Sequence, residues 1–124
     1  MKTNSINWFE IPTRNMDKAV AFYEQTLGVQ LHREVFGGEP HAMFPVEKTA
    51  ASVTGAIVAA PRLTPGQGVV IYLDAPDGVK ACLARAAKAG AKEVAPHTAI
   101  GEHGFIAVVS DPDGNQVGLH SMQA

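Results

Sequence analysis

Three side chains that can carry acid–base or hydrogen-bonding chemistry stand on segments with the pattern of β-strands. They are Glu10, Tyr72 and His120. A carboxylate can act as a base or bind a cation, a phenol can donate to a developing oxyanion, and an imidazole can exchange a proton near neutral pH. We predict that these three candidate catalytic residues share one cavity and control the binding of a small molecule.

The alternation of side chains along the strands is the reason for grouping these residues. Successive side chains of a strand point to opposite faces, and Phe9 and Leu119 need the face that a helix covers. Glu10, Tyr72 and His120 then fall on the other face. The alternative is that Glu10 and His120 only satisfy each other, because buried polar groups must be paired.

The first half of the chain predicts a strand, a helix and three more strands. Four segments have strand character: residues 6–12, 29–36, 41–46 and 53–59. Asn15 offers a helix N-cap, Gly28 ends that helix, and Gly37 with Gly38 turns a hairpin. Pro61 and residues 63–66 mark a connection.

The second half predicts the same order of elements. Its strand-like segments are residues 69–74, 94–95, 105–109 and 116–120. Asp77 is expected to cap the helix and Gly90 to close it, while Asp-Pro-Asp-Gly at 111–114 predicts a β-turn between the last two strands. A shift of 62 residues superposes Gly28 on Gly90, which favours an internal repeat. The alternative is two similar amphipathic helices in an α+β domain without a repeat.

Several motifs together resemble the vicinal oxygen chelate superfamily, which includes glyoxalase I, extradiol dioxygenases and bleomycin-resistance proteins. They are NWFEIP, FYEQTLG, AKAGAKEV, IGEHGFIA and DPDGNQVGLHS. Within that superfamily the chain is most similar to single-domain proteins related to lactoylglutathione lyase. The resemblance implies an α+β fold in one domain over 1–124, with βαβββ modules at about 6–60 and 68–121. Their curved mixed sheets would surround a central cavity, with the helices outside.

The resemblance also bears on a metal. In metal-using members the ligands sit on the first and last strands of each module, and these positions map onto Trp8, Ala56, Val70 and Gly118. None of these side chains is an imidazole, carboxylate or thiolate, the groups that bind divalent ions in proteins. We therefore predict no family-type metal site and no cofactor.

Other residues are candidates for ligand contacts or for purely structural roles. The predicted ligand-binding residues are Trp8, Phe44 and His103. The indole of Trp8 is either core filling or the flat wall of a pocket. His103 and His97 flank a loop at 98–104 that can close over a cavity mouth, although loop histidines are more often merely exposed.

Three further residues are given structural roles. His32 and His41 lie on or near the predicted hairpin, where we expect them to be exposed. Cys82 stands on the apolar face of its helix and is expected to act as a small buried hydrophobe.

Composition limits the classes of function. The 124 residues are 46% hydrophobic, with a net charge of −2 and no basic cluster, which argues against a nucleic-acid partner. One cysteine fits a reducing compartment, and no apolar run has the length of a membrane span. The start of the chain, residues 1–5, has no signal-peptide pattern, so we expect a soluble cytoplasmic protein.

The predicted function is the binding of a small organic molecule in the cavity between the modules, without the family metal. The alternative is a metal-free lyase, isomerase or epimerase that uses Glu10 and His120. A metal-dependent glyoxalase or dioxygenase is less favoured. No dinucleotide fingerprint, P-loop, CxxC pair or nucleophile elbow is present. Open sheet edges further predict a homodimer.

Overall fold

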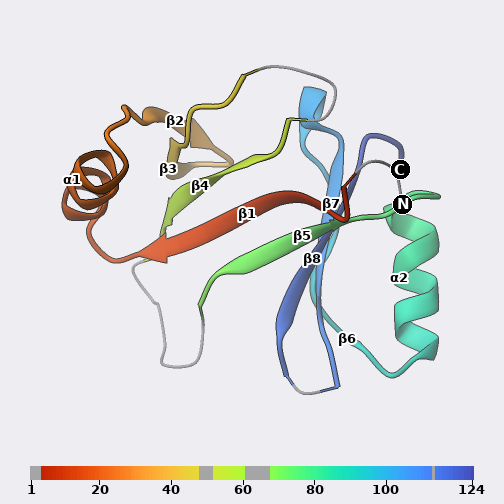
Figure 1. Cartoon of the computed structure of the whole chain (residues 1–124). Coiled ribbons are helices and arrows are strands. Elements are labelled where there is room, and N and C mark those ends of the chain that lie inside the picture. The colour runs from red at the N-terminus through yellow and green to blue at the C-terminus, as the bar shows by residue number, and fades with distance from the viewer. Residues whose placement is uncertain (1–3, 48–51, 61–67, 113) are drawn as a thin grey trace. The chain divides into compact units, whose positions relative to one another are not determined.

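The computed structural model describes residues 4–47, 52–60, 68–112 and 114–124. The chain divides into an N-terminal unit, Trp8–Val69, and a C-terminal unit, Val70–Ala124, which also includes Met1–Asn7. Both units have the βαβββ order that the sequence predicts (Figure 1). The predicted connection at Pro61 and 63–66 lies outside the described residues.

The N-terminal unit contains a mixed sheet and one helix. Its elements are β1 (Ile6–Thr13), α1 (Met16–Leu27), β2 (His32–Phe36), β3 (Glu39–Met43) and β4 (Thr54–Ala59). The strand order is β2-β3-β4-β1, in which β1 and β4 are parallel and the other pairs antiparallel. The predicted cap is confirmed, because Asn15 Oδ1 accepts from the Lys18 amide at 3.0 Å. Gly28 follows the helix with φ 67°, a left-handed conformation that favours glycine.

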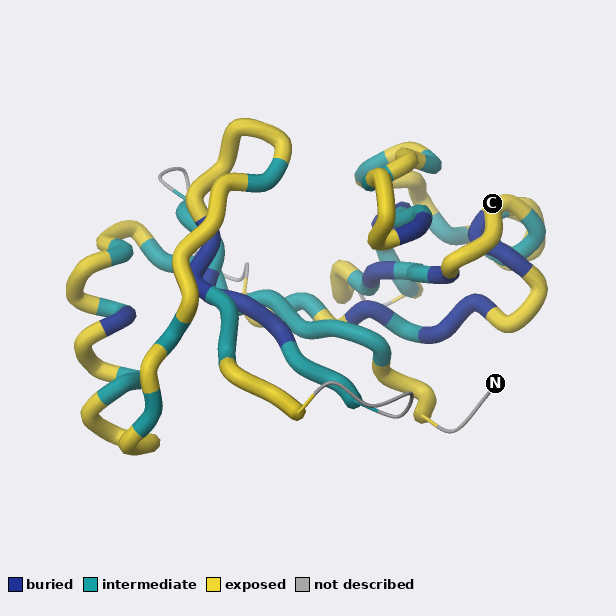
Figure 2. The backbone as a smooth tube through the Cα atoms, turned by 90° about the horizontal axis from the view of Figure 1, so that it is seen from above, coloured by how far each residue is buried: buried dark blue, intermediate teal, exposed yellow. Residues whose placement is uncertain are grey.

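The core of the N-terminal unit lies between α1 and one face of its sheet. Val20 of α1, Ala42 of β3 and Ile57 of β4 are buried together. Burying an isoleucine side chain contributes roughly 1.5–3 kcal/mol, so this contact fixes the helix on the sheet. Most of the remaining surface of α1, at the left in Figure 2, is exposed.

The C-terminal unit repeats this plan. Its elements are β5 (Val70–Asp74), α2 (Val79–Lys88), β6 (Lys92–Ala99), the 3-10 helix η1 (Gly101–His103), β7 (Phe105–Ser110) and β8 (Gln116–Ser121). The strand order is β5-β8-β7-β6, in which β5 and β8 are parallel and the other pairs are antiparallel. Helix α2 packs on β6, β7 and β8 through Val79, with Ala75 and Ala107 buried beside it. The predicted repeat is therefore confirmed at the level of strand pairing.

The turn between β7 and β8 has the predicted geometry in its described residues. The amide of Asn115 donates to Asp111 Oδ1 at 2.9 Å, and the amide of Gly114 donates to the Asp111 carbonyl at 3.0 Å. Gly114 has φ 87°, which a residue with a Cβ rarely adopts. Asp113 lies outside the described residues.

Strand β6 is longer than the sequence predicts. Only residues 94–95 have a clear strand signal, but pairing with β7 extends the strand over Lys92–Ala99. Pro96 breaks the alternation, and the register shifts on both sides of Ala95. His97 consequently lies in a strand and not in a loop, with its ring stacked on Phe105 at 5.1 Å.

The predicted N-cap of α2 is wrong. Gly78, with φ 100°, occupies that position, and it has no side-chain cap hydrogen bond. The carboxylate of Asp77 instead accepts two hydrogen bonds from Arg85, each at 2.7 Å. A guanidinium offers a planar pair of donors, which competes successfully with a single backbone amide.

Candidate functional site

In the C-terminal unit, two of the predicted site residues lie on the sheet face opposite α2. Leu119 packs with Ala107 in the core beside the helix, so Gly118 and His120 point to the other face. Tyr72 is the cross-strand partner of Gly118. The structure thus places Tyr72 and His120 on one face, as alternation predicts.

The ring of Tyr72 covers Gly118. A Cβ added at Gly118 would come within 2.2 Å of Tyr72 Cδ1, which is closer than two carbon atoms can approach. Tyr72 is only 6% exposed, so its ring has little room to move away. Glycine at 118 is therefore required by the packing of Tyr72.

His120 is held by polar partners at both ring nitrogens. Asn7 Nδ2 lies 3.1 Å from His120 Nδ1, and His120 Nε2 lies 2.7 Å from the carbonyl oxygen of His103. Because a carbonyl only accepts, Nε2 carries the proton and Nδ1 accepts from the Asn7 amide. This arrangement fixes one tautomer of a neutral imidazole.

The same amide group binds a buried carboxylate. Asn7 Nδ2 also donates to Asp74 Oδ1 at 3.1 Å, and Asp74 is 8% exposed. Asp74 is the cross-strand partner of His120, so the two side chains share a face. We define the Asn7 cluster as Asn7, Asp74 and His120.

Our sequence reasoning missed two members of this cluster. Asp74 was detectable, because alternation carried two residues beyond Tyr72 places it on the same face. Asn7 could not be found in this way, because it lies two residues before the core residue Phe9 and alternation therefore assigns it to the helix-covered face.

In the N-terminal unit, Trp8 and Glu10 lie on the sheet face opposite α1. The intervening Phe9 contacts the ring of Phe44 in the core, with 5.5 Å between ring centroids. Trp8 Nε1 donates to Glu10 Oε2 at 3.3 Å. This bond orients the indole beside the carboxylate.

His41 is buried, which corrects the prediction that it is exposed. It is 8% exposed, and its ring lies edge-on to Phe36 with centroids 5.1 Å apart. Its Nδ1 lies 2.9 Å from the Glu39 carbonyl oxygen, and its Nε2 lies 3.9 Å from Glu10 Oε2. Hairpin register turns this side chain toward Glu10, and residue type alone gave no sign of it.

The remaining predicted residues have other surroundings. Phe44 packs between Phe9 and Tyr23 on the helix side of the sheet. His103 is exposed, its ring Nε2 lies 3.7 Å from Glu102 Oε1, and its carbonyl oxygen accepts from His120 Nε2 at 2.7 Å. These contacts give Phe44 a core position and His103 a backbone contact with the Asn7 cluster.

Glu10 belongs to the N-terminal unit, whereas Tyr72 and His120 belong to the C-terminal unit. A shared site of all three therefore stays a prediction.

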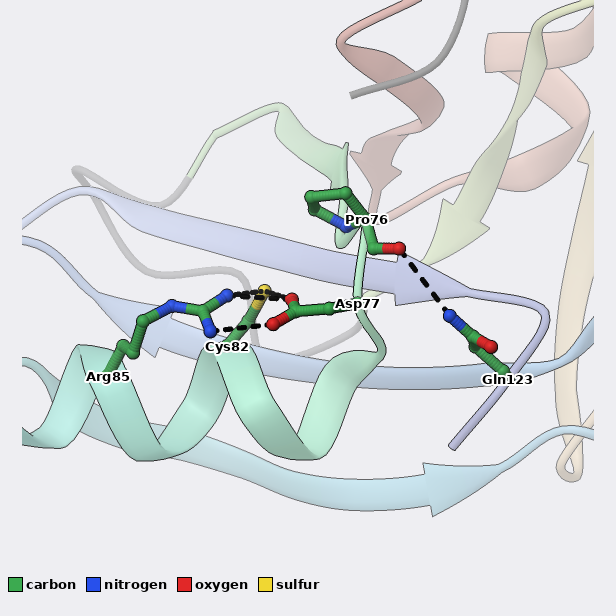
Figure 3. Close-up of polar contacts among 5 residues, drawn as sticks. All are labelled: Pro76, Asp77, Cys82, Arg85 and Gln123. Atoms are coloured by element: carbon green, nitrogen blue, oxygen red, sulfur yellow. Dashed lines mark hydrogen bonds and ion pairs between the residues drawn. The ribbon is translucent and has the colours of Figure 1, made fainter.

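A separate polar cluster joins Asp77 to Cys82 and Arg85 of α2 (Figure 3). Cys82 is partly buried and packs against the core of the C-terminal unit, on the apolar side of the helix where the sequence places it. The two hydrogen bonds from Arg85 hold the pKa of Asp77 well below its usual range, and those bonds raise the pKa of Arg85. Burial, followed by its hydrogen bond to Asp77, raises the pKa of the Cys82 thiol. A raised pKa keeps the thiol protonated, so this cluster suits a structural role rather than a nucleophile.

The side chains at the family's metal positions do not fit a metal ion. Trp8, Ala56 and Val70 offer no suitable donor, and the space above Gly118 is filled by the ring of Tyr72. Across the described ranges, no group of three or more His, Cys, Asp or Glu residues is arranged to hold an ion.

None of the helices in the described part of the chain has both the length and the apolar character needed to cross a membrane.

Solved structures with a similar fold include two methylmalonyl-CoA epimerases. The Streptomyces coelicolor enzyme (Q60A), in complex with 2-nitronate-propionyl-CoA, is 21% identical, with a TM-score of 0.67 over 94% of this chain and 95% of that one. The Mycobacterium tuberculosis enzyme is 19% identical, with a TM-score of 0.68 over 96% and 90%. A hypothetical protein from Bacillus halodurans is 13% identical, with a TM-score of 0.71 over 99% of both chains. At these identities the likeness shows the fold alone.

Sequence comparison gives the family. No curated protein matches the chain. A family model described as Glyoxalase/Bleomycin resistance protein/Dioxygenase superfamily matches residues 5–119. This match extends over both βαβββ units. The chain therefore belongs to the glyoxalase/bleomycin resistance protein/dioxygenase superfamily.

Proposed function

We propose that this protein binds a small organic molecule with an apolar body and one oxygen-bearing polar group, and that it does so without the family metal. The observation that supports this function is the burial of ionisable side chains on the sheet faces opposite the helices. Asp74 and His41, one in each unit, are both 8% exposed. Burying such groups costs free energy, so their presence on these faces makes them candidates for contact with a ligand.

Each proposed contact has its own chemical role. In the C-terminal unit, Tyr72 and His120 bind the polar group, with the His120 ring held in orientation by Asn7. When the ligand binds, the Nε2–H of His120 donates to a ligand oxygen instead of to the His103 carbonyl. This change of partner is made easier because η1, which contains His103, is exposed. In the N-terminal unit, Trp8 covers an apolar part of the ligand beside Glu10. Phe44 is left out, because its ring packs in the core.

The test uses the chain's single tryptophan. Trp8 fluorescence and thermal unfolding are measured against a panel of acyl-CoA thioesters and small aromatic carbonyl and hydroxyl compounds. Acyl-CoA thioesters are included because the S. coelicolor neighbour was solved with one. Binding is expected to raise the melting temperature and to change the emission of Trp8.

Variants locate the site of any ligand found in this way. Tyr72→Phe and His120→Ala should each weaken binding by about 1–3 kcal/mol, because each loses a hydrogen bond to the polar group of the ligand. His32→Asn is the matched control, since His32 is exposed and its Nε2 lies 2.8 Å from Glu34 Oε1. If neither site variant weakens binding while both stay folded, the assignment of the site is wrong.

A second candidate is a metal-free epimerase or isomerase. It is favoured by the fixed tautomer of His120, because a general acid–base must present a defined proton. In this reaction one of Glu10 and His120 removes the proton on a carbon next to a carbonyl, Tyr72 donates to the enolate oxygen, and the other residue returns a proton to the carbon.

Exchange with solvent separates this candidate from simple binding. Methylmalonyl-CoA in D₂O should exchange its α-proton in the presence of the wild-type protein, and Glu10→Gln and His120→Ala should abolish this exchange. If the wild-type protein binds the thioester without accelerating exchange, it acts on this compound as a binding protein and not as an epimerase.

A further inference from the structure

The side chains of Glu10 and His41 lie close together in the N-terminal unit, with 3.9 Å between His41 Nε2 and Glu10 Oε2. The side chain of His41 is 9% exposed and that of Glu10 is 25% exposed. Glu10 is the cross-strand partner of Ala56, and His41 is the cross-strand partner of Val58. Ala56 and Val58 flank Ile57, which packs against α1, so Glu10 and His41 stand on the opposite face of the sheet. Two chemically active groups are thus held together by three strands of one unit.

The hydrogen bond at Nδ1 fixes what His41 presents to Glu10. The Glu39 carbonyl oxygen 2.9 Å away can only accept, so Nδ1 carries a proton. In the neutral ring Nε2 is then an acceptor. It faces Glu10 Oε2, which is also an acceptor, at 3.9 Å. Trp8 Nε1 already donates to this carboxylate oxygen at 3.3 Å, and a carboxylate oxygen can accept more than one hydrogen bond.

The separation suits a bridging donor. At 3.9 Å the two atoms are too far apart for a direct hydrogen bond. A nitrogen or oxygen atom at an ordinary donor distance of roughly 2.8–3.0 Å from both can bridge them. The surroundings set the rest of the ligand's chemistry, because Trp8 and Phe36 border this pair with aromatic rings.

We propose that Glu10 and His41 form a subsite for a hydrogen-bond donor of the ligand, an O–H or N–H group carried on an apolar body that contacts Trp8. This subsite rests on the proposed small-molecule binding and adds to the ligand a donor group besides the oxygen-bearing group assigned to Tyr72 and His120. It also makes His41 a ligand-contacting residue.

Four probes of similar shape test the donor requirement. Benzyl alcohol supplies O–H and benzylammonium supplies N–H, whereas benzyl methyl ether and benzyltrimethylammonium supply neither. Titrations follow Trp8 by its fluorescence and by its indole N–H signal, the only one in the chain. Both donors should bind at least about tenfold more tightly than their methylated counterparts, the loss that one missing hydrogen bond to a buried group produces.

Variants test the two acceptors. Glu10→Gln should weaken donor binding about tenfold, because its amide nitrogen can itself donate to His41 Nε2 and occupy the gap. His41→Phe keeps a flat ring beside Phe36 and removes the acceptor, with the same expected loss. Glu34→Gln is the matched control, since Glu34 is the cross-strand partner of His41 but bonds to exposed His32.

The outcomes separate the subsite from the proposed function. Equal binding of methylated and donor probes, or donor binding unchanged in Glu10→Gln, overturns the subsite while small-molecule binding stands. Tight benzyltrimethylammonium binding that ignores His41→Phe indicates only a cation over the Trp8 ring, which also overturns it. No response to either donor, when another compound from the panel binds elsewhere, rejects the subsite alone.

Discussion

The ring of Tyr72 lies over Gly118 so closely that a methyl group at residue 118 would stand 2.2 Å from Cδ1 of the ring. Gly118→Ala should therefore lower the free energy of unfolding by about 1–3 kcal/mol, the usual cost of overpacking. Urea denaturation measures this change. In Tyr72→Ala the same substitution should cost much less, because the obstructing ring is gone.

Gly68→Ala is the control for that experiment. Among the described residues, a Cβ at Gly68 meets no atom within 4 Å, so this variant should change stability by no more than about 0.5 kcal/mol. Equal effects of the two glycine substitutions would contradict the packing argument.

The Asn7 cluster should depend on its amide. Asn7→Leu keeps a similar shape but leaves Asp74 Oδ1 and His120 Nδ1 without this donor, so we expect a loss of about 1–3 kcal/mol in the free energy of unfolding. ¹⁵N spectra of the His120 ring should also lose the single Nε2–H tautomer. Gln25→Leu, on the exposed side of α1, is the comparison and should leave both readings unchanged.

Cys82 should react slowly with alkylating reagents at neutral pH. Its pKa is raised, first by burial and then by the hydrogen bond to Asp77, so little thiolate forms until the pH exceeds the usual thiol range. Asp77→Asn removes a negative neighbour and frees Arg85, and both changes lower the pKa of Cys82 and speed the reaction. Mass spectrometry follows this single cysteine directly. A wild-type rate equal to that of a free thiol peptide would refute the effect.

Protein purified without chelator or affinity tag should retain well below one equivalent of Zn, Ni, Fe or Mn after dialysis. The reason is the chemistry of Trp8, Ala56, Val70 and Gly118, which provide no ligand set. Elemental analysis decides the matter. A retained stoichiometric metal would direct attention back to a glyoxalase or dioxygenase reaction.

We also expect a homodimer. Strands β2 and β6 are edge strands of their units. Val35 on β2 and Val94 on β6 are exposed. Proteins usually pair or cover such edges. Light scattering at roughly tens of micromolar, where an interface of standard size holds two chains together, should give twice the chain mass. A single-chain mass under these conditions would exclude the dimer.

Patterns within short segments predicted the order of the helices and strands and most of their positions. The helix over Met16–Leu27 followed from its spacing and from Asn15 and Gly28, and the faces of Tyr72, Leu119 and His120 followed from alternation. These features depend on backbone geometry, which repeats along a strand or helix and can be read one residue at a time.

The partners of individual polar atoms were decided only in the tertiary structure. Alternation assigns Asn7 to the same face as the core residue Phe9, yet its amide contacts Asp74 and His120, which are far along the chain. His41 reaches Glu10 because the register of β3 on β4 and of β4 on β1 brings their strands together. Register is a cooperative property of paired strands, so no single segment contains the information that joins these atoms.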